Sequence, residues 1–268
     1  MLDPAPPITG AGAPIEGRGV TQRFPTRGGA PFTAIEDVAF AVAGGEFVSL
    51  IGPSGCGKST LMLRVAGLIP PSGGEIRVGG RKLEAPLTDV GIVFQDHLLL
   101  DFRTALDNIL LQHDVRRLPR EAGKADALAL MRKLGIDHAA DRYPGQLSGG
   151  MRQRVSIARA LIHAPSVLLM DEPFGALDAI TRTQIRHDLE MLWLETRKTV
   201  LFITHSVDEA VGLSDRMLVM GPSPGRIVEE IVIDLPRPRP AHLGEYPTFN
   251  AYAERIHDAF RRLGVIKY

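Results

Sequence analysis

Short apolar runs recur along the chain, and turn-forming or charged residues separate them. The first clear run, 46–52, ends at a glycine and is followed by 58–68, where apolar residues recur at helical spacing. Four further apolar runs lie at 91–95, 166–173, 199–205 and 215–220. Nearly continuous apolar strands separated by helices are typical of a parallel sheet covered on both faces. The pattern therefore predicts an α/β fold that opens with a strand, a glycine loop and a helix.

Other segments of the chain have different patterns. The section 97–163 is mostly helical, and within it residues 120–135 place apolar side chains on one helical face and end at a glycine. Upstream of the first apolar run, 20–43 has the pattern of two short strands joined by a polar turn. We therefore expect a main domain over 20–235, with a helical subdomain at about 97–163.

The two ends of the chain differ from this domain. Residues 1–19 contain several prolines and glycines and few apolar groups, so we expect a flexible leader there. Residues 236–268 begin with alternating prolines and continue with apolar residues at helical spacing from Phe249 to Leu263. This pattern predicts a proline-rich linker followed by a C-terminal helix that packs on the core.

Composition and charge exclude several classes of protein. The 268 residues carry a formal net charge of zero, which gives no overall positive field, so we expect no nucleic-acid partner. The single cysteine, Cys56, excludes an intramolecular disulfide. No run approaches the roughly 18 apolar residues of a spanning helix, and the N-terminus lacks the basic and apolar regions of a secretory signal. We therefore expect the chain to stay in the cytosol.

The segment GPSGCGKST at 52–60 matches the phosphate-loop pattern G-x-x-x-x-G-K-[ST] between a predicted strand and a predicted helix. Backbone N–H groups of such a loop curl around phosphate, the lysine reaches the β- and γ-phosphates, and the following serine ligates Mg²⁺. The alternative is a glycine-rich turn with a surface lysine, which the flanking elements disfavour. The candidate nucleotide-binding residues are Gly52, Pro53, Ser54, Gly55, Cys56, Gly57, Lys58, Ser59 and Thr60.

Two adjacent carboxylates follow the apolar residues 167–170. Asp171, at the end of a buried strand, can meet the Mg²⁺ held at the phosphate loop, through a water molecule. Glu172 can orient or deprotonate the attacking water. A solvated strand end is the alternative, and the upstream phosphate loop favours the catalytic interpretation. These residues predict a site for a nucleoside triphosphate and Mg²⁺.

The segment LSGGMRQRVSIARAL at 147–161 predicts a second helix start that can hold an anion. Ser148 is a good helix N-cap, and Gly149 and Gly150 leave backbone N–H groups uncovered. One chain rarely needs two helix ends on the same γ-phosphate unless a second subunit supplies one of them. The alternative is an ordinary capped helix with a glycine-rich start.

Taken together, these motifs resemble those of the nucleotide-binding subunit of an ATP-binding cassette (ABC) transporter, over about residues 20–235. The motifs stand in the order of that family: the phosphate loop at 52–60, Gln95, the signature motif at 147–151, the Walker B segment at 167–172, Asp178 and His205. The resemblance implies a RecA-like P-loop core with a parallel sheet, an N-terminal antiparallel β-subdomain and an inserted helical subdomain. It also implies ATP and Mg²⁺ as cofactors and ATP hydrolysis as the activity.

The family resemblance assigns roles to matching residues. Two copies would close head to tail, so that residues 148–150 of one chain cap the γ-phosphate at Lys58 of the other. Gln95 would contact Mg²⁺ and the attacking water and sense the membrane partner. His205 would hydrogen-bond the γ-phosphate, and Asp178 would connect the two sites across the dimer. The other seven histidines have no motif support, so we expect them at the surface or at helix ends.

The residue that stacks on adenine is less defined by the resemblance. An aromatic residue upstream of the phosphate loop usually fills this role, and Phe24 is our candidate. Phe32 is the alternative, because residues 25–33 look inserted relative to a compact family member, and both could instead be core phenylalanines. Two departures from the family pattern are Met151, where glutamine is usual, and Gly175, where serine is common.

Several longer segments, including 225–239 (GRIVEEIVIDLPRPR), resemble the group that imports nitrate, sulfonate, taurine and related small nutrients. That resemblance implies a separate membrane permease, which would dock at Leu98–Ile109, an indirect solute-binding protein partner, and a peripheral location on the cytoplasmic face of the inner membrane. A soluble ABC ATPase outside transport and a non-hydrolysing regulatory module are the alternatives. The chain has neither a long coiled-coil insertion nor a second cassette, and it retains Glu172 and His205.

Overall fold

A computed structural model describes residues 12–240, 244 and 247–265. The larger of its two sheets has six strands in the order β10-β9-β3-β8-β7-β6. In chain order these are β3 (Phe47–Ile51), β6 (Val90–Val93), β7 (Val167–Asp171), β8 (Thr199–Thr204), β9 (Arg216–Met220) and β10 (Ile227–Val232). All neighbours pair in parallel except β10, which is antiparallel to β9. The predicted α/β core with a parallel sheet is confirmed.

Both faces of this sheet are buried, which explains why its strands are apolar at almost every position. On β8, Val200 and Phe202 belong to one buried cluster, while Leu201 and Ile203 belong to another on the opposite face. Helix α1 (Lys58–Val65) covers the second face, and α6 (Ala179–Thr196) covers the first. The sheet is therefore a rigid frame whose strand ends can hold polar side chains in fixed positions.

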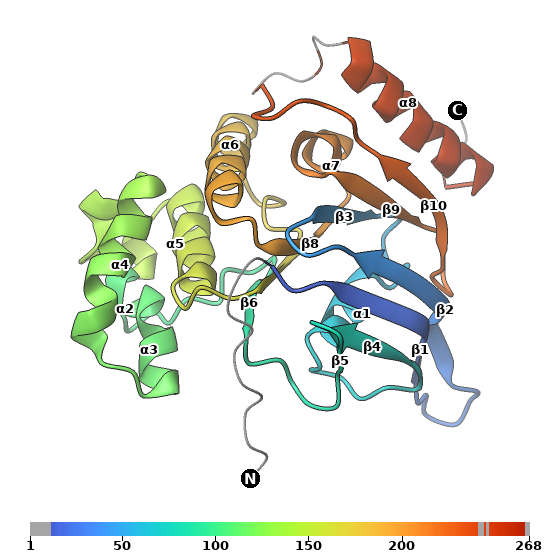
Figure 1. The fold of residues 1–268 in the computed structure, drawn as a ribbon, viewed down its shortest axis with the longest axis horizontal. Helices are drawn as coiled ribbons and strands as arrows, with labels where there is room; N and C mark the ends of the chain where they lie inside the picture. The colour runs from blue at the N-terminus through green and yellow to red at the C-terminus, as the bar shows by residue number, and fades with distance from the viewer. Residues whose placement is uncertain (1–11, 241–243, 245–246, 266–268) are drawn as a thin grey trace.

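The second sheet is antiparallel and lies beside the core, as the N-terminal β-subdomain was predicted to do (Figure 1). Its strand order is β2-β1-β4-β5. The strands are β1 (Ile15–Phe24), β2 (Phe32–Val42), β4 (Gly73–Val78) and β5 (Arg81–Lys82).

The prediction of a flexible leader over 1–19 is wrong for residues 15–19, which form the first half of β1. Ile15 is completely buried, and Gly17 lies so close to the Phe40 ring that a Cβ would sit 2.2 Å from its Cε1 atom. A glycine is needed for this close packing, so the low apolar content is misleading here. Residues 1–11 lie outside the described part of the chain.

A group of helices sits beyond the β6 edge of the sheet (Figure 1). It consists of α2 (Ala105–Ile109), α3 (Leu111–Arg116), α4 (Arg120–Lys133) and α5 (Gly149–Leu161), with short 3-10 turns at Asp137–Ala139 and Pro144–Gln146. Helix α5 is in contact with α2, α4 and β6, so it joins this group to the sheet.

The chain returns to the core after β10. Helix α8 (Pro247–Arg262) buries Phe249, Ile256 and Ala259 against residues of α7 (Val207–Leu213), β9 and β10, which confirms that the terminal helix packs on the core. Among the described residues, no helix combines the length and the apolar character needed to cross a membrane.

Candidate functional site

The loop between β3 and α1 has the backbone geometry of an anion cradle. Gly55 and Gly57 have φ angles of +75° and +100°, values that favour glycine. A Cβ at Gly57 would lie 2.5 Å from the Ile35 side chain, whereas at Gly55 it would meet open space. Helix α1 has no side-chain cap, so the first N–H groups of the helix are left to an outside acceptor.

Lys58 lies inside this loop. The residue is only 6% exposed, and its Nζ donates hydrogen bonds to the backbone carbonyls of Gly52 at 2.9 Å and Pro53 at 3.0 Å. Within the described part of the chain, no carboxylate forms an ion pair with Lys58. The third donor of the ammonium has only a long contact, 4.0 Å, with the Cys56 Sγ atom, so the charged group retains the capacity to bind a phosphate oxygen. The loop and its lysine therefore fit a polyphosphate.

Cys56 supports the loop and does not react. Its side chain is buried, and burial raises the pKa of its thiol. A Cβ added at Gly225 would lie 1.9 Å from the carbonyl oxygen of Cys56, so a second segment packs directly on this part of the loop. A protonated, buried thiol is a small packing group.

Asp171 and Ser59 come together at the end of β7 and the start of α1. The Ser59 hydroxyl hydrogen-bonds the Asp171 carboxylate. Burial raises the pKa of Asp171, the charge of Glu172 acts in the same direction, and the Ser59 hydrogen bond lowers it. A hydroxyl and a carboxylate are the oxygen ligands that suit Mg²⁺, which takes its other ligands from phosphate and water. No cluster of three or more His, Cys, Asp or Glu side chains that could hold a metal occurs among the described residues.

Glu172 and His205 face each other across the ends of β7 and β8. The His205 Nδ1 atom lies 3.2 Å from the Glu172 Oε2 atom. Glu172 adopts φ +43°, an unusual value for a non-glycine residue that costs about 1 kcal/mol. Its N–H donates to the Ile203 carbonyl at 2.9 Å, which fixes this turn onto β8. His205 is 63% exposed, so the pair is open to solvent on one side.

Gln95 reaches the same strand ends from β6. It is exposed, and a Cβ at Gly175 would lie 3.9 Å from its Nε2 atom. The Gly175 N–H donates to the Glu172 carbonyl at 3.1 Å, so Gln95 borders the turn that carries the carboxylate. Strands β3, β8, β7 and β6 are neighbours in the sheet, and their carboxyl ends hold Lys58, His205, Asp171 and Gln95 together.

The signature motif forms a second, separate helix start, that of α5. The Ser148 Oγ atom accepts a hydrogen bond from the Met151 N–H at 3.2 Å and caps α5. Gly150 is buried, and a Cβ there would lie 2.5 Å from the Thr181 side chain. Met151, the departure from the family pattern, is half-buried and packs against the core cluster of its own chain. Ser148 itself is exposed.

The family model for "ABC transporter" matches residues 35–175 of the chain. The chain belongs to this family. As a member it is an ATP-binding cassette with ATPase activity. The cassette is 45% identical to an uncharacterized ABC transporter ATP-binding protein of Methanocaldococcus jannaschii, over 77% of each chain.

Other relatives carry transport names. The cassette is 46% identical to the taurine import ATP-binding protein of Rhizobium johnstonii, over 80% of this chain and 82% of that protein. It is 43% identical to a bicarbonate transport ATP-binding protein of Synechocystis, over 86% and 83% of the two chains. The structure superimposes on the dimeric structure of a bacterial ABC transporter cassette with a TM-score of 0.73 and 32% identity, covering 82% of this chain and 99% of that chain.

Asp178 starts α6 of the cassette. Its Oδ1 atom accepts a hydrogen bond from the Thr181 N–H at 3.0 Å, and this bond lowers the pKa of the carboxyl group. The side chain is exposed at the helix start, close in sequence to Gly175. In the single chain Asp178 therefore acts as a helix cap.

The two aromatic candidates face each other in the antiparallel sheet. Phe24 at the end of β1 pairs in register with Phe32 at the start of β2. Phe24 is half-buried and Phe32 is 51% exposed, so neither belongs to the buried core. The alternative that both are core phenylalanines is wrong.

Sequence reasoning missed a connection between the Gln95 segment and the signature helix. The His97 Nε2 atom lies 3.1 Å from the Gly149 carbonyl oxygen. Arg159 on α5 donates to the carbonyls of His97 at 2.7 Å and Leu98 at 2.6 Å. His97 stands outside every motif, and bonds to backbone carbonyls leave no residue pattern, so the sequence contains no signal for this connection.

Proposed function

We propose that this ATPase energises the import of a small solute, of the nitrate, sulfonate or taurine type, through a separate membrane permease, working as a head-to-tail dimer. The observation that carries the hydrolytic part is the Glu172–His205 pair beside the phosphate loop. The import part is supported by relatives named for taurine import and bicarbonate transport. Taurine and bicarbonate are both small and carry a negative group.

In this proposal the phosphate loop binds the ATP phosphates. Lys58 exchanges a carbonyl contact for β- and γ-phosphate oxygens, and the uncapped start of α1 adds its N–H groups. Ser59, Gln95 and Asp171 would hold Mg²⁺, which neutralises charge on the phosphates when it is bound. Phe24 stacks on adenine, with Phe32 as the alternative from the facing strand.

Glu172 acts as the general base. It takes a proton from the water that attacks the γ-phosphorus atom in line with the leaving oxygen. His205 faces Glu172 through Nδ1, which leaves Nε2 for a γ-phosphate oxygen. Gln95 orients the water from the other side of the Glu172 turn.

The second copy completes each site. Ser148 is exposed, Gly149 is half-buried and Gly150 is buried. The backbone N–H groups of the two glycines lie in the first turn of α5, where the helix itself offers them no acceptor. We propose that they cap the γ-phosphate bound at the partner's phosphate loop, while Asp178 connects the two sites. A solved relative described as a dimeric cassette supports this arrangement.

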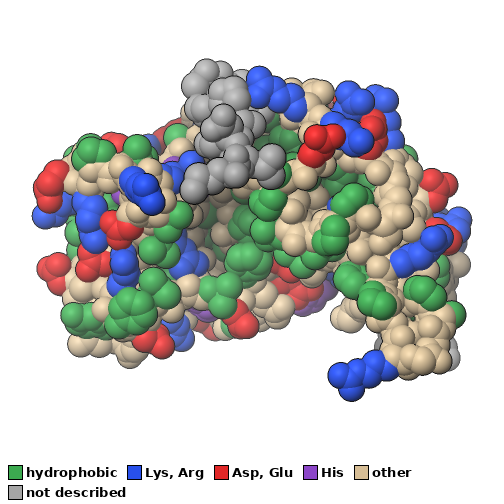
Figure 2. Space-filling view, turned by 90° about the horizontal axis from the view of Figure 1, so that it is seen from below, with side chains coloured by type: hydrophobic (Ala, Val, Ile, Leu, Met, Phe, Trp, Pro, Cys, Tyr) green, Lys and Arg blue, Asp and Glu red, His purple; other side chains and the backbone are tan. Residues whose placement is uncertain are grey.

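The permease would dock on the segment Leu98–Ile109. Leu98 and Phe102 are 57% and 75% exposed, large values for apolar side chains. Figure 2 shows a group of apolar side chains along the lower edge of the lobe at the left, where Figure 1 places α2–α5, with charged side chains around it. Such docking would hold the chain at the cytoplasmic face of the membrane, with the solute-binding protein as an indirect partner.

The general-base role predicts that Glu172→Gln lowers ATP turnover by about 100-fold or more, because the amide cannot accept a proton. ATP binding should persist, since the phosphate loop is unchanged, and the ATP-bound dimer should accumulate. Phosphate release, equilibrium ATP binding and light scattering measure the three quantities. Glu121→Gln, an exposed carboxylate of α4, is the matched control and should leave all three unchanged. Rapid hydrolysis by Glu172→Gln would contradict the proposal.

The importer role predicts that a tagged chain co-purifies with a multi-spanning membrane protein from detergent-solubilised membranes of its host. Phe102→Asp should abolish this co-purification, because a charge in an apolar docking contact is desolvated without a partner. Its ATPase activity as an isolated chain should equal that of the unmodified chain. Recovery of soluble or nucleic-acid-associated partners alone would favour the soluble ABC ATPase instead.

A further inference from the structure

A short segment after β10 crosses the far ends of two helices that begin at the proposed site. This segment is 236–240, where proline and arginine alternate, and we call it the strap. Helix α6 begins directly after Asp178, and α7 begins two residues after His205. Proline restricts the backbone, so the strap loses little conformational entropy when it is held in place.

Arg237 of the strap joins three elements at once. Its guanidinium forms an ion pair with Glu190 of α6 at 2.9 Å and a two-nitrogen contact with Asp215, directly before β9, at 2.9 and 3.1 Å. It also donates to the carbonyl of Leu213, the last residue of α7. The same group stacks on the Trp193 ring of α6, 4.4 Å from its centroid. Planar, bidentate contacts of this kind require arginine.

Arg239 holds the end of α7. Its backbone N–H donates to both carboxylate oxygens of Glu190, at 3.1 and 3.0 Å. Its guanidinium donates to the carbonyls of Val211 and Ser214, which have no partner inside the helix, and it is almost completely buried. Burial lowers the pKa of Arg239 to about 10, with the charge of Arg237 as a further cause, and the group stays positive at neutral pH.

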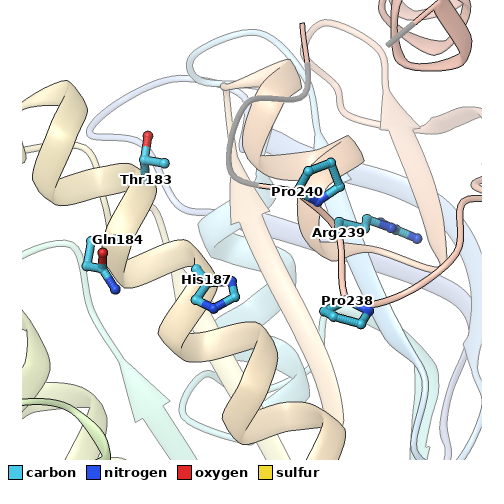
Figure 3. A pocket seen from close by; sticks show the side chains of 6 residues that line it. All are labelled: Thr183, Gln184, His187, Pro238, Arg239 and Pro240. Atoms are coloured by element: carbon cyan, nitrogen blue, oxygen red, sulfur yellow. The ribbon is translucent and has the colours of Figure 1, made fainter. Parts of the chain in front are cut away.

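The strap contacts α6 in both of its halves: at Glu190 and Trp193 in the second half, and in the first half through Arg186, which donates to the Pro240 carbonyl at 3.1 Å. Figure 3 shows Thr183 and His187 of α6 facing the strap across a cavity, with Arg239 pointing away from them. This cavity has a volume of about 310 Å³. The strap therefore holds α6 through the Arg237 contacts with Glu190 and Trp193, far from Asp178, and through the Arg186 bond nearer the site.

Two further contacts join the helices nearer the site, and in the first Arg186 of α6 donates to the Asp208 carbonyl of α7 at 3.4 Å. Arg182 of α6 lies 3.7 Å from Glu209 of α7, and the Glu209 carboxylate accepts a hydrogen bond from the Thr204 hydroxyl. Thr204 immediately precedes His205. The direction of α7, and with it the position of His205 over Glu172, is thus fixed at both ends.

We propose that Arg237 is a positioning residue for ATP hydrolysis. By clamping α6 to α7, the strap keeps His205 against Glu172 and sets the start of α6 at Asp178. This rests on the proposed function, in which His205 and Glu172 serve hydrolysis. Among the described residues, no hydrogen bond or ion pair joins the strap to the phosphate loop, so we expect the clamp to affect turnover and not ATP binding.

Arg237→Met tests this, because methionine keeps part of the apolar stem and removes the charge. We expect kcat to fall by about tenfold and the KM for ATP to stay within about twofold. The single variant leaves Glu190 buried with one charged partner fewer, which could itself disturb the fold. The double variant Arg237→Met/Glu190→Gln removes both charges of this ion pair and should show the same lower kcat with an unchanged KM. Arg237→Lys should restore kcat in part, since lysine keeps the positive charge but lacks the planar guanidinium that makes the two-nitrogen contact.

Trp193 is the single tryptophan of the chain, so its fluorescence reports release of the strap in each variant. Arg255→Met is the matched control, because the polar contacts of Arg255 are with Glu229 and the Glu230 carbonyl of β10. It should change neither kcat nor the tryptophan signal. Folded Arg237 variants with an altered tryptophan signal, a lower melting temperature and unchanged kcat would overturn the proposal. The proposed function would still stand in that case if Glu172→Gln remained inactive.

Discussion

The phosphate loop and the signature motif are both glycine-rich helix starts, but they differ in how each helix start is satisfied. Helix α1 follows Gly57 and has no side-chain cap, so its N–H groups face a loop that also holds Lys58. Helix α5 is capped by Ser148, whose hydroxyl accepts from the Met151 N–H. An uncapped helix end needs an outside acceptor, whereas a capped end is stable alone.

The groups that surround the two helix starts also differ. The phosphate loop lies at the strand ends that carry Asp171, Glu172 and His205, so chemically active groups converge on it within one chain. The signature end instead meets Thr181 of α6 and the ring of His97. A helix N-terminus attracts an anion in both cases, but only the first has the groups to react with one. In the proposed dimer, the second is the lid that covers the ATP site of the other copy.

Ser148→Arg is expected to have the largest effect among the variants that test this difference between the two helix starts. In the proposed head-to-tail dimer, the long cationic side chain would fill the space of the partner's γ-phosphate, so ATP turnover should fall by about 100-fold or more. ATP binding to the single chain should be unchanged, because the phosphate loop is complete without the signature motif. Turnover and equilibrium ATP binding, measured on the same preparation, check both statements.

Gly145→Arg supplies the control, since it adds the same charge three residues earlier at an exposed position where a Cβ meets nothing within 4 Å. It should retain most of the activity. Ser148→Ala distinguishes the loss of the helix cap from the blocking of the proposed dimer contact. It removes the hydroxyl, which costs about 1 kcal/mol of stability, and adds no bulk. Normal turnover in Ser148→Arg would show that each chain hydrolyses ATP without the partner's helix.

The difference between the two regions also explains what a sequence can predict. The strand ends that carry Asp171 and His205 were predictable, because buried parallel strands are nearly continuous apolar runs; β7 ends at Asp171, and His205 directly follows the last residue of β8. The N-terminal strand was placed too short, since Gly17 serves a close contact with Phe40 that no composition rule reveals.

Contacts with backbone carbonyls could not be predicted from the sequence. Arg237 and Arg239 look like a solvated basic linker, yet they bind the last carbonyls of α7 and the buried Glu190. Lys58 donates to carbonyls as well, but its motif identified it in advance. A motif consists of particular side chains at fixed spacing. A hydrogen bond to a backbone carbonyl requires a particular side chain only on the donor's side, because every residue has a carbonyl.

The smallest effect we expect concerns the contact between the two regions, which His97 makes with the Gly149 carbonyl at 3.1 Å. His97→Ala removes this hydrogen bond between the Gln95 segment and the signature helix. Losing one such bond is worth about 1 kcal/mol, so kcat should fall by about fivefold if the whole loss appears in the transition state. The KM for ATP should not change, because Lys58 and its loop are untouched.

His138→Ala is the matched control, since His138 is exposed in a 3-10 turn of the same helical group. It should show the kcat of the unmodified chain. Arg159 still holds the carbonyls of His97 and Leu98 in the His97→Ala variant, so the segment should remain in place and the protein should melt at nearly the same temperature. Equal kcat values for the two alanine variants would mean that the contact only fills space between the regions. A selective loss in His97→Ala would mean that the lid offered to the partner's ATP is mechanically joined to the glutamine at the chain's own ATP.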